Sequence, residues 1–97
     1  VGCGGGILSE SLAGLGAEVM AIDASEKTIN IAKAHAKEVK SNVKYLNTTT
    51  EELLNDKSHL KFDLITCLEM LEHVPEPSQT INEFSSLLSQ NGDLIIS

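Results

Sequence analysis

The sequence predicts an α/β protein built on a parallel sheet, because short apolar runs alternate with segments of helical periodicity along the whole chain. No internal repeat interrupts this order, and no apolar run approaches the roughly 20 residues that a helix needs to cross a bilayer. A length of 97 residues suits one small domain or part of a larger one. We therefore expect a single, partial domain over residues 1–97.

The expected strands are short, rich in apolar or β-branched residues, and bounded by polar residues or glycine. Their ranges are Glu18–Ile22, Val43–Leu46, Phe62–Cys67 and Asp93–Ile96, with Val1–Cys3 as the stump of a further strand. Because the chain opens inside this stump, we expect the domain to be truncated at its N-terminus.

The segments between these strands have helical spacing and recognisable end signals. Leucines at positions 8, 12 and 15 form the apolar stripe of the first helix, which Gly16 is expected to end. Ser25 is a plausible N-cap for the second helix, and Thr50 for a short third one. Pro77 suits the first turn of the last helix, and Asn91-Gly92 is expected to close it.

Strands that alternate with helices indicate a doubly wound parallel sheet with helices on both faces. Crossover connections between parallel strands are right-handed, which makes the expected fold Rossmann-like. In such sheets ligands bind at the carboxyl ends of the strands.

The charge of the chain bears on which partners it can bind, and its cysteines bear on the redox compartment in which it works. Fourteen acidic against seven basic residues give a net charge of −7, which would repel a phosphate backbone, so we expect no nucleic-acid partner. Cys3 and Cys67 lie at the ends of apolar runs and neither has a CxxC partner. This favours reduced thiols in an intracellular protein over a zinc site.

A glycine-rich segment, Val-Gly-Cys-Gly-Gly-Gly, joins the strand stump to the first helix. Glycines allow a close backbone approach to a ligand, and the helix start beyond them favours an anionic group. The dinucleotide fingerprint G-x-G-x-x-G would need glycine at position 7, where this chain has Ile7. The G-x-G-x-G spacing of Gly2, Gly4 and Gly6 instead resembles the pattern of Rossmann-like methyltransferases, whose donor S-adenosylmethionine carries a carboxylate. The alternative is an ordinary glycine-rich turn.

Asp23 ends the second expected strand, 19 residues after Gly4. An acid about 20 residues beyond such a loop can accept hydrogen bonds from both ribose hydroxyls. The alternative is that Asp23 merely caps the following helix. Ser25 is available for that role, which leaves Asp23 freer to bind a ligand.

Three polar side chains cluster after the fourth strand, at Glu69, Glu72 and His73. On one turn of helix they share a face, where two carboxylates and an imidazole could hold a divalent cation such as Mg²⁺. Alternatively, His73 is a general base. The structural alternative is that the glutamates solvate a helix end and His73 packs against Pro75.

The remaining candidates carry weaker signals. We interpret His35 and His59 as surface residues. Leu68 and the Asn47–Thr50 stretch fall at strand ends where an adenine ring could rest, although Leu68 could equally belong to the core.

Taken together, these motifs resemble the ubiquinone biosynthesis O-methyltransferase family. The similar segments are Val-Gly-Cys-Gly-Gly-Gly-Ile-Leu-Ser-Glu-Ser, Ile-Asp, His-Ala and Cys-Leu-Glu-Met-Leu-Glu-His-Val-Pro-Glu-Pro, at residues 1–11, 22–23, 35–36 and 67–77. The Glu-Met-Leu-Glu-His-Val-Pro block is the most specific of them. Position 68 is often Met in bacterial relatives, and Asn91-Gly92 stands where Pro-Gly or Gly-Gly is usual.

The resemblance implies an enzyme that transfers a methyl group from S-adenosylmethionine to phenolic hydroxyls of polyprenylated ubiquinone precursors. It assigns the methionine part of the cofactor to the loop of Gly2, Cys3, Gly4 and Gly6, the ribose to Asp23 and the adenosine to Leu68. The proposed magnesium ligands of the family fall on Glu69, Glu72 and His73. Relatives continue through two more strands, so truncation is expected at both ends.

The substrate that the resemblance implies is a small polyprenyl phenol or catechol. The resemblance is also compatible with peripheral association of the protein with a membrane or with a ubiquinone-synthesis complex. The expected location is the cytoplasm, or peripherally the inner membrane, on the matrix side in a mitochondrion. Two alternatives stay open. One is a methyltransferase of the same fold with another small-molecule substrate; the other is a nucleotide-binding module without methyl transfer, against which Ile7 argues.

Overall fold

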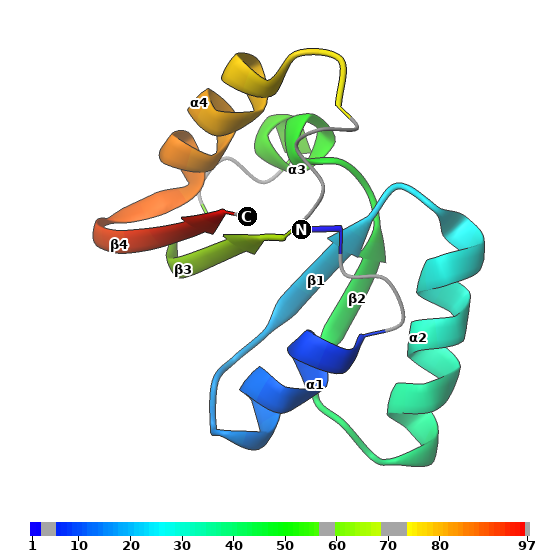
Figure 1. Cartoon of the computed structure of the whole chain (residues 1–97). Coiled ribbons are helices and arrows are strands. Elements are labelled where there is room, and N and C mark those ends of the chain that lie inside the picture. Colours follow the sequence, from blue (N-terminus) through cyan, green and yellow to red (C-terminus); the bar gives the residue numbers. More distant parts are fainter. Residues whose placement is uncertain (3–5, 57–59, 69–73, 97) are drawn as a thin grey trace. The chain divides into compact units, whose positions relative to one another are not determined.

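The structure is a computed structural model of the whole chain, and it describes residues 1–2, 6–56, 60–68 and 74–96 (Figure 1). The chain divides into two compact units. One unit comprises residues 2–48, and the other comprises residues 49–97 together with Val1. Each unit is α/β and has its own pair of parallel strands.

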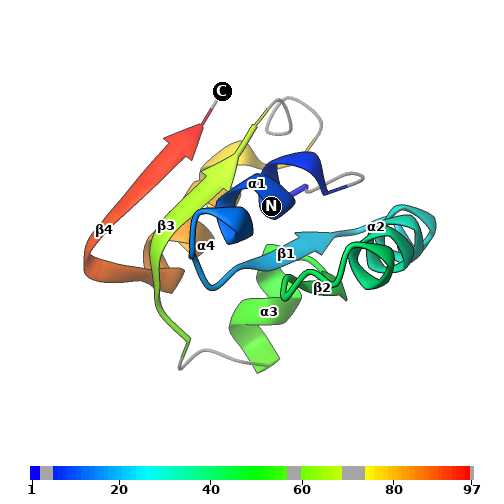
Figure 2. The ribbon, with the colours of Figure 1, turned by 90° about the horizontal axis from the view of Figure 1, so that it is seen from below.

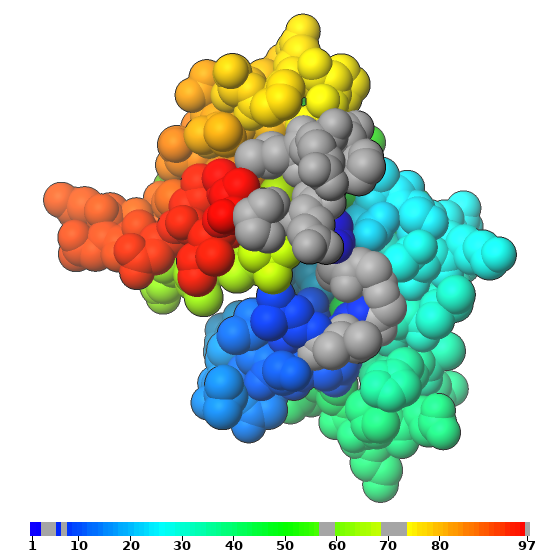
Figure 3. All heavy atoms as spheres, viewed as in Figure 1, coloured from blue at the N-terminus to red at the C-terminus, as the bar shows by residue number. Residues whose placement is uncertain are grey.

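The unit of residues 2–48 contains two helices and two strands: α1 (Ile7–Gly14), β1 (Met20–Asp23), α2 (Glu26–Glu38) and β2 (Lys44–Asn47). The two strands run parallel, with Met20 opposite Lys44 and Asp23 opposite Asn47. The helix α2 connects them and lies alongside the pair (Figure 1 and Figure 2). Its outer residues form the cyan to green surface in Figure 3. This is a β-α-β unit, as the alternating pattern predicted.

The core of this unit joins α2 to both strands. Its buried members are Ala21, Ile29, Ala32, Ala36, Val43 and Tyr45. The half-buried Ala13 and Val19 pack against them, so α1 also contributes to this core. Alanines at two of the three buried positions of α2 let the helix lie close to the strands.

Capping interactions explain where the helices of this unit begin and end. Ser25 caps α2, because its Oγ accepts a hydrogen bond from the Thr28 amide at 3.2 Å. Gly16, with φ of 97°, ends α1: the Ala17 amide donates to the Leu12 carbonyl at 3.2 Å, which completes a Schellman motif. The same motif ends α2, but there Lys40 occupies the left-handed position with φ of 57°.

The second unit contains α3 (Thr50–Asp56), β3 (Phe62–Cys67), α4 (Pro77–Leu87) and β4 (Leu88–Ile96). β3 and β4 are parallel and lie side by side, with Ile65 opposite Leu94 and Cys67 opposite Ile96 (Figure 1 and Figure 2). α4 contacts both α3 and β4. The buried apolar residues of the unit are Leu53, Ile65, Cys67, Phe84 and Leu87.

Two starting signals of this unit behave differently. Pro77 occupies the first turn of α4, as predicted. The cap of α3 is Thr49 rather than Thr50, because the Thr49 Oγ1 accepts from the Glu52 amide at 3.1 Å, whereas Thr50 is buried and is already the first residue of the helix. Two adjacent threonines can each cap, and burial of the second leaves the first to do so.

Some strand ends predicted from the sequence differ from those in the structure. β1 begins at Met20 rather than Glu18, and β2 is one residue later than predicted, at Lys44–Asn47. The predicted strand at Val1–Cys3 is not formed at Val1 or Gly2, and Cys3 lies outside the described residues. The Val1 amino group nevertheless donates to the Thr66 carbonyl of β3 at 2.9 Å.

The largest difference concerns Asn91-Gly92, which does not close a helix. α4 ends at Leu87, and β4 begins at Leu88 instead of Asp93. Phe62 pairs with Leu88 and Leu64 with Asp93, so two steps along β3 (64 − 62) face five along β4 (93 − 88). Asn91 and Gly92 belong to this irregular stretch, whose extra residues bulge from the ladder.

Gly92 is fitted to its place by close packing. A Cβ atom at this position would lie 2.9 Å from the Phe62 carbonyl oxygen and 3.2 Å from that of Ser89. Backbone atoms cannot move aside as the end of a side chain can. The glycine therefore lets the irregular stretch lie against β3.

No helix in the described part of the chain is long and apolar enough to span a membrane.

We expect Gly92→Ala to lower the free energy of unfolding by about 1–3 kcal/mol, because the added methyl group overpacks this contact. Chemical denaturation at neutral pH measures the change. The exposed neighbour Asn91→Ala is the control, and it should change stability by less than about 0.5 kcal/mol. Equal stabilities for the two variants would contradict the packing role of Gly92.

Candidate functional site

The described ends of the glycine-rich segment have backbone conformations that favour glycine. Gly2 has φ of 65° and Gly6 has φ of 94°, both in the left-handed region. Gly6 is the residue before α1 and occupies its N-cap position without a capping side chain. Cys3 and Gly4, the other two predicted cofactor residues here, lie outside the described residues.

Gly6 also has no room for a side chain. It is buried, and a Cβ atom there would overlap the hydroxyl oxygen of Tyr45 and lie 3.0 Å from the ring carbon Cζ. Tyr45 belongs to β2 and is itself buried. Two independent constraints, positive φ and close packing, therefore require glycine at the start of α1.

Tyr45 is linked to α1 by a short hydrogen bond. Its hydroxyl donates to Oε2 of Glu10 over 2.6 Å. Glu10 lies in the first turn of α1, and its amide donates to the Gly6 carbonyl at 2.9 Å. Gly6 thus contacts Tyr45, and its carbonyl accepts a hydrogen bond from the amide of Glu10. The carboxylate of the same Glu10 accepts the hydrogen bond from Tyr45.

The surroundings of Glu10 favour its charged form. Hydrogen bonding from the Ser41 side chain, then that from Tyr45, lowers the pKa of Glu10 below its ordinary value of 4.5, and the charge of His35 acts in the same direction. Partial burial opposes these effects without overcoming them. Glu10 is therefore an ionised acceptor at neutral pH.

Asp23 ends β1, as its sequence position indicated, and is half-buried. Its Oδ1 accepts from the Ser25 amide at 2.8 Å, so the carboxylate takes part in the turn into α2 even though Ser25 caps that helix. The idea that the Ser25 cap leaves Asp23 freer for a ligand is thus only partly right. This turn fixes the Asp23 side chain at the carboxyl end of β1.

The backbone of Asp23 is held by the neighbouring strand. Its carbonyl oxygen accepts from Nδ2 of Asn47 at 3.0 Å and from the Thr48 amide at 3.2 Å. Asn47 is opposite Asp23 in the register and belongs to the stretch that we considered for an adenine ring. In this structure its amide group supports the end of β1.

In the other unit, Leu68 follows β3 and is 41% exposed, so its side chain is not part of the core. Cys67 beside it is fully buried, and burial raises the pKa of its thiol. The predicted metal ligands and base, Glu69, Glu72 and His73, lie outside the described residues, as does His59. Within the described ranges no group of three His, Cys, Asp or Glu side chains could hold a metal ion.

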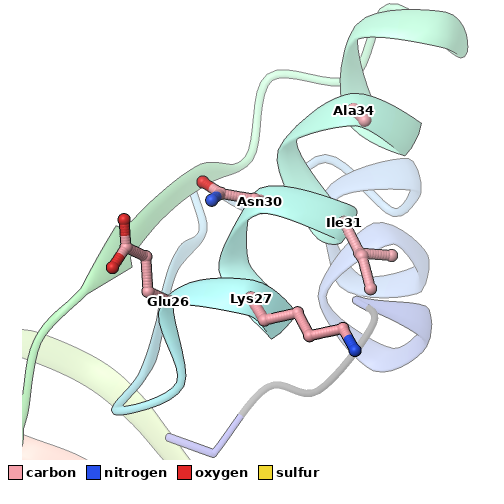
Figure 4. Close-up of a pocket in the computed structure, with 5 residues that line it drawn as sticks. All are labelled: Glu26, Lys27, Asn30, Ile31 and Ala34. Carbon is pink, nitrogen blue, oxygen red and sulfur yellow. The ribbon is translucent and has the colours of Figure 1, made fainter.

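A shallow, open depression lies on the outer face of α2 (Figure 4). Its lining residues are Glu26, Lys27, Asn30, Ile31 and Ala34, all from this one helix. Figure 4 shows the side chains of Glu26 and Asn30 on one side and those of Lys27 and Ile31 on the other. No predicted site residue lines it. His35, which follows Ala34, is an exposed residue of the same helix, as predicted.

Comparison with known proteins identifies the class. A family model described as a methyltransferase domain matches residues 1–96, so this chain belongs to the family of methyltransferase domains. It is similar over its whole length to the ubiquinone biosynthesis O-methyltransferase of Marinobacter nauticus, with 47% identity over 98 residues that cover 41% of that protein. The protein of the same name from Histophilus somni is 48% identical over 100 residues, 42% of its length. The chain thus spans about two fifths of these relatives.

Solved structures support the fold. The magnesium protoporphyrin IX methyltransferase ChlM from Synechocystis, with bound SAM, matches 98% of this chain and 45% of its own, with a TM-score of 0.81 and 34% identity. A methyltransferase from Clostridium acetobutylicum matches the fold with a TM-score of 0.84 at 22% identity. The prediction of a Rossmann-like α/β methyltransferase fold is therefore confirmed.

Sequence reasoning missed Glu10 and Tyr45. Each has an unremarkable position in its own element, and only the fold brings them together across 35 residues. One signal was available: a tyrosine at a core-facing strand position needs a partner for its hydroxyl.

The lowered pKa of Glu10 predicts how its contribution to stability depends on pH. Wild type should be more stable than Glu10→Gln above pH 4.5, and this advantage should disappear as pH falls through the folded-state pKa, because the charged form is then lost. Urea denaturation of both proteins from pH 3 to 7 measures it, with the exposed Glu51→Gln as control. An advantage that grew on acidification would refute the assignment.

Proposed function

We propose that this chain is the cofactor-binding part of an O-methyltransferase that transfers a methyl group from S-adenosylmethionine to phenolic hydroxyls of polyprenylated ubiquinone precursors. The observation that carries the proposal is 47% identity, over the whole chain, to a ubiquinone biosynthesis O-methyltransferase. The left-handed glycines before α1 and the carboxylate at the end of β1 support the cofactor class. We treat residues 1–97 as part of one such domain.

The glycine-rich segment and α1 are proposed to bind the methionine part of the cofactor. Gly2, Cys3, Gly4 and Gly6 would bring backbone amides close to its carboxylate, and the positive end of α1 would favour that charge. The fit rests on Gly6, where positive φ and tight packing exclude any side chain that would cover the backbone.

Asp23 is proposed to accept hydrogen bonds from the ribose hydroxyls. Its place at the carboxyl end of a parallel strand, and the turn that fixes its side chain, support this role. Leu68 is proposed to contact the adenosine, since an exposed leucine directly after a strand offers an apolar surface to a flat ring.

When bound, S-adenosylmethionine supplies an electrophilic methyl group on a positively charged sulfur, and the group passes to a phenolate oxygen. The protein must align donor and acceptor and keep the phenol ionised. Where no metal ion binds, His73 is proposed to take the phenolic proton as the general base. Alternatively, Glu69, Glu72 and His73 would hold a divalent ion such as Mg²⁺, for which the carboxylate oxygens are suitable donors and the imidazole a less typical one. Such an ion would lower the pKa of the phenol.

The proposed substrate is a small polyprenyl phenol or catechol. Its polyprenyl tail is apolar and partitions into a bilayer. We therefore propose that the protein associates peripherally with the inner membrane or with an assembly for ubiquinone synthesis. The proposed location is the cytoplasm in a bacterium and the matrix side of the inner membrane in a mitochondrion.

A second candidate is a methyltransferase of the same fold that acts on another small molecule. The observation that favours it is the 34% identity to ChlM, which is named for a magnesium porphyrin substrate. Methyl transfer to a demethylated ubiquinone precursor, compared with transfer to a magnesium porphyrin, distinguishes the two.

The first prediction of this proposal concerns cofactor binding. The protein, expressed with all of the sequence that its gene encodes, should bind S-adenosylhomocysteine and not NAD in calorimetric titration. Asp23→Ala should weaken binding at least about tenfold, because hydrogen bonds to a charged group contribute about 1.5–3 kcal/mol. Glu18→Ala, which removes an exposed acid before β1, is the control and should leave binding unchanged. Binding of NAD alone would refute the proposal.

The second prediction concerns the base and the metal. His73→Ala should lower the rate of methyl transfer about 10²-fold or more if His73 removes the phenolic proton. If a divalent ion takes part, exhaustive chelation should abolish activity and Mg²⁺ should restore it. Activity that survives chelation would exclude the metal, and full activity in His73→Ala would exclude both roles. Lys33→Ala, at an exposed position of α2, is the control.

A further inference from the structure

Tyr45 is a core residue whose hydroxyl lies at the start of α1. The residue is 4% exposed and belongs to the same core cluster as Ala21 and Ile29. The hydroxyl is in contact with Gly6, where a methyl group would overlap it, and it donates to Glu10 at 2.6 Å. A polar group thus reaches from the core of this unit to the end of its glycine-rich segment.

Glu10 closes this arrangement from the side of α1. Its amide donates to the Gly6 carbonyl at 2.9 Å, while its carboxylate accepts from Tyr45. Gly6 is therefore held by one backbone hydrogen bond and by contact with the tyrosine that the same glutamate binds. We call these three residues the Gly6–Glu10–Tyr45 cluster.

Core packing alone does not account for a tyrosine here. A phenylalanine would fill the same space without burying a hydroxyl, and a buried hydroxyl is costly unless it is hydrogen-bonded. The acceptor is a carboxylate, which makes the bond stronger than one between neutral groups. Ser41 and His35 also favour the charge of Glu10, so β2, α2 and the turn between them all act on this acceptor.

We propose that Tyr45 and Glu10 are positioning residues for the cofactor, because they fix the Gly6 end of the segment that would receive its carboxylate. This inference rests on the proposed function. A loop held in its binding conformation loses less conformational entropy when ligand binds, so loosening its anchor weakens binding without removing any contact to the ligand. Tyr45 and Glu10 would thereby influence affinity although neither touches the cofactor.

The test is the affinity of the full-length protein for S-adenosylhomocysteine, measured by calorimetry beside thermal unfolding. Tyr45→Phe should raise Kd about tenfold, the effect expected from loss of one charge-assisted hydrogen bond. Glu10→Ala should weaken binding to a similar extent. Glu10→Gln keeps an oxygen that can accept from Tyr45 and should weaken binding less. The double variant Tyr45→Phe, Glu10→Ala should resemble either single variant, since both remove the same interaction.

Val43→Ala is the matched control. Val43 is a buried residue of the same core, just before β2, and it is not part of the cluster. This variant should lower the melting temperature while its Kd stays at the wild-type value. If Kd follows the melting temperature in every variant, including Val43→Ala, the role is merely structural and the proposal fails.

The outcomes separate this proposal from the proposed function. Wild-type protein that does not bind S-adenosylhomocysteine refutes both. Wild type and Tyr45→Phe that bind equally well refute only the positioning role. If Tyr45→Phe does not fold, the two Glu10 variants decide: a Kd that rises from wild type through Glu10→Gln to Glu10→Ala supports the proposal, and equal values overturn it.

Discussion

The absence of a side chain at residue 6 is the constraint on which the first unit depends. α1 can begin beside β2 because Gly6 leaves room for the Tyr45 hydroxyl and tolerates φ of 94°. Glu10, one turn further along, then accepts from that hydroxyl. Any larger residue at position 6 would separate the helix from the strand and break both contacts. The start of α1 is therefore determined by the core, and not by the glycine-rich segment alone.

The strand β2 contacts both described residues of its unit that lie next to a strand or helix end and that we propose for cofactor binding, Gly6 and Asp23. Tyr45 contacts Gly6, and the Asn47 side chain donates to the Asp23 carbonyl. These two residues are separated by one position, so their side chains leave the strand on the same side. Parallel register places Asn47 opposite Asp23. The strand β2 thus connects the glycine-rich segment and Asp23 through its own side chains.

The sequence predicted those features that depend on neighbouring residues. Ser25, Gly16 and Pro77 mark helix ends through contacts within one turn, and each was found where expected. Gly6 and Asp23 were proposed as cofactor residues from spacing alone, and that role stays a prediction. Features that depend on pairing across the fold were missed. β4 begins at Leu88 because Phe62 pairs with it, and the sequence near Asn91-Gly92 contains no sign of this. Glu10 and Tyr45 were missed for the same reason.

The position of Tyr45 has an optical consequence. It is the only tyrosine of the chain, which has no tryptophan and two phenylalanines. The near-ultraviolet absorption and emission of residues 1–97 therefore come almost entirely from one phenol, shielded from water and bonded to a carboxylate. The tyrosine spectrum thus depends on the contact between α1 and β2. A change in this spectrum can be assigned to that contact without an added label.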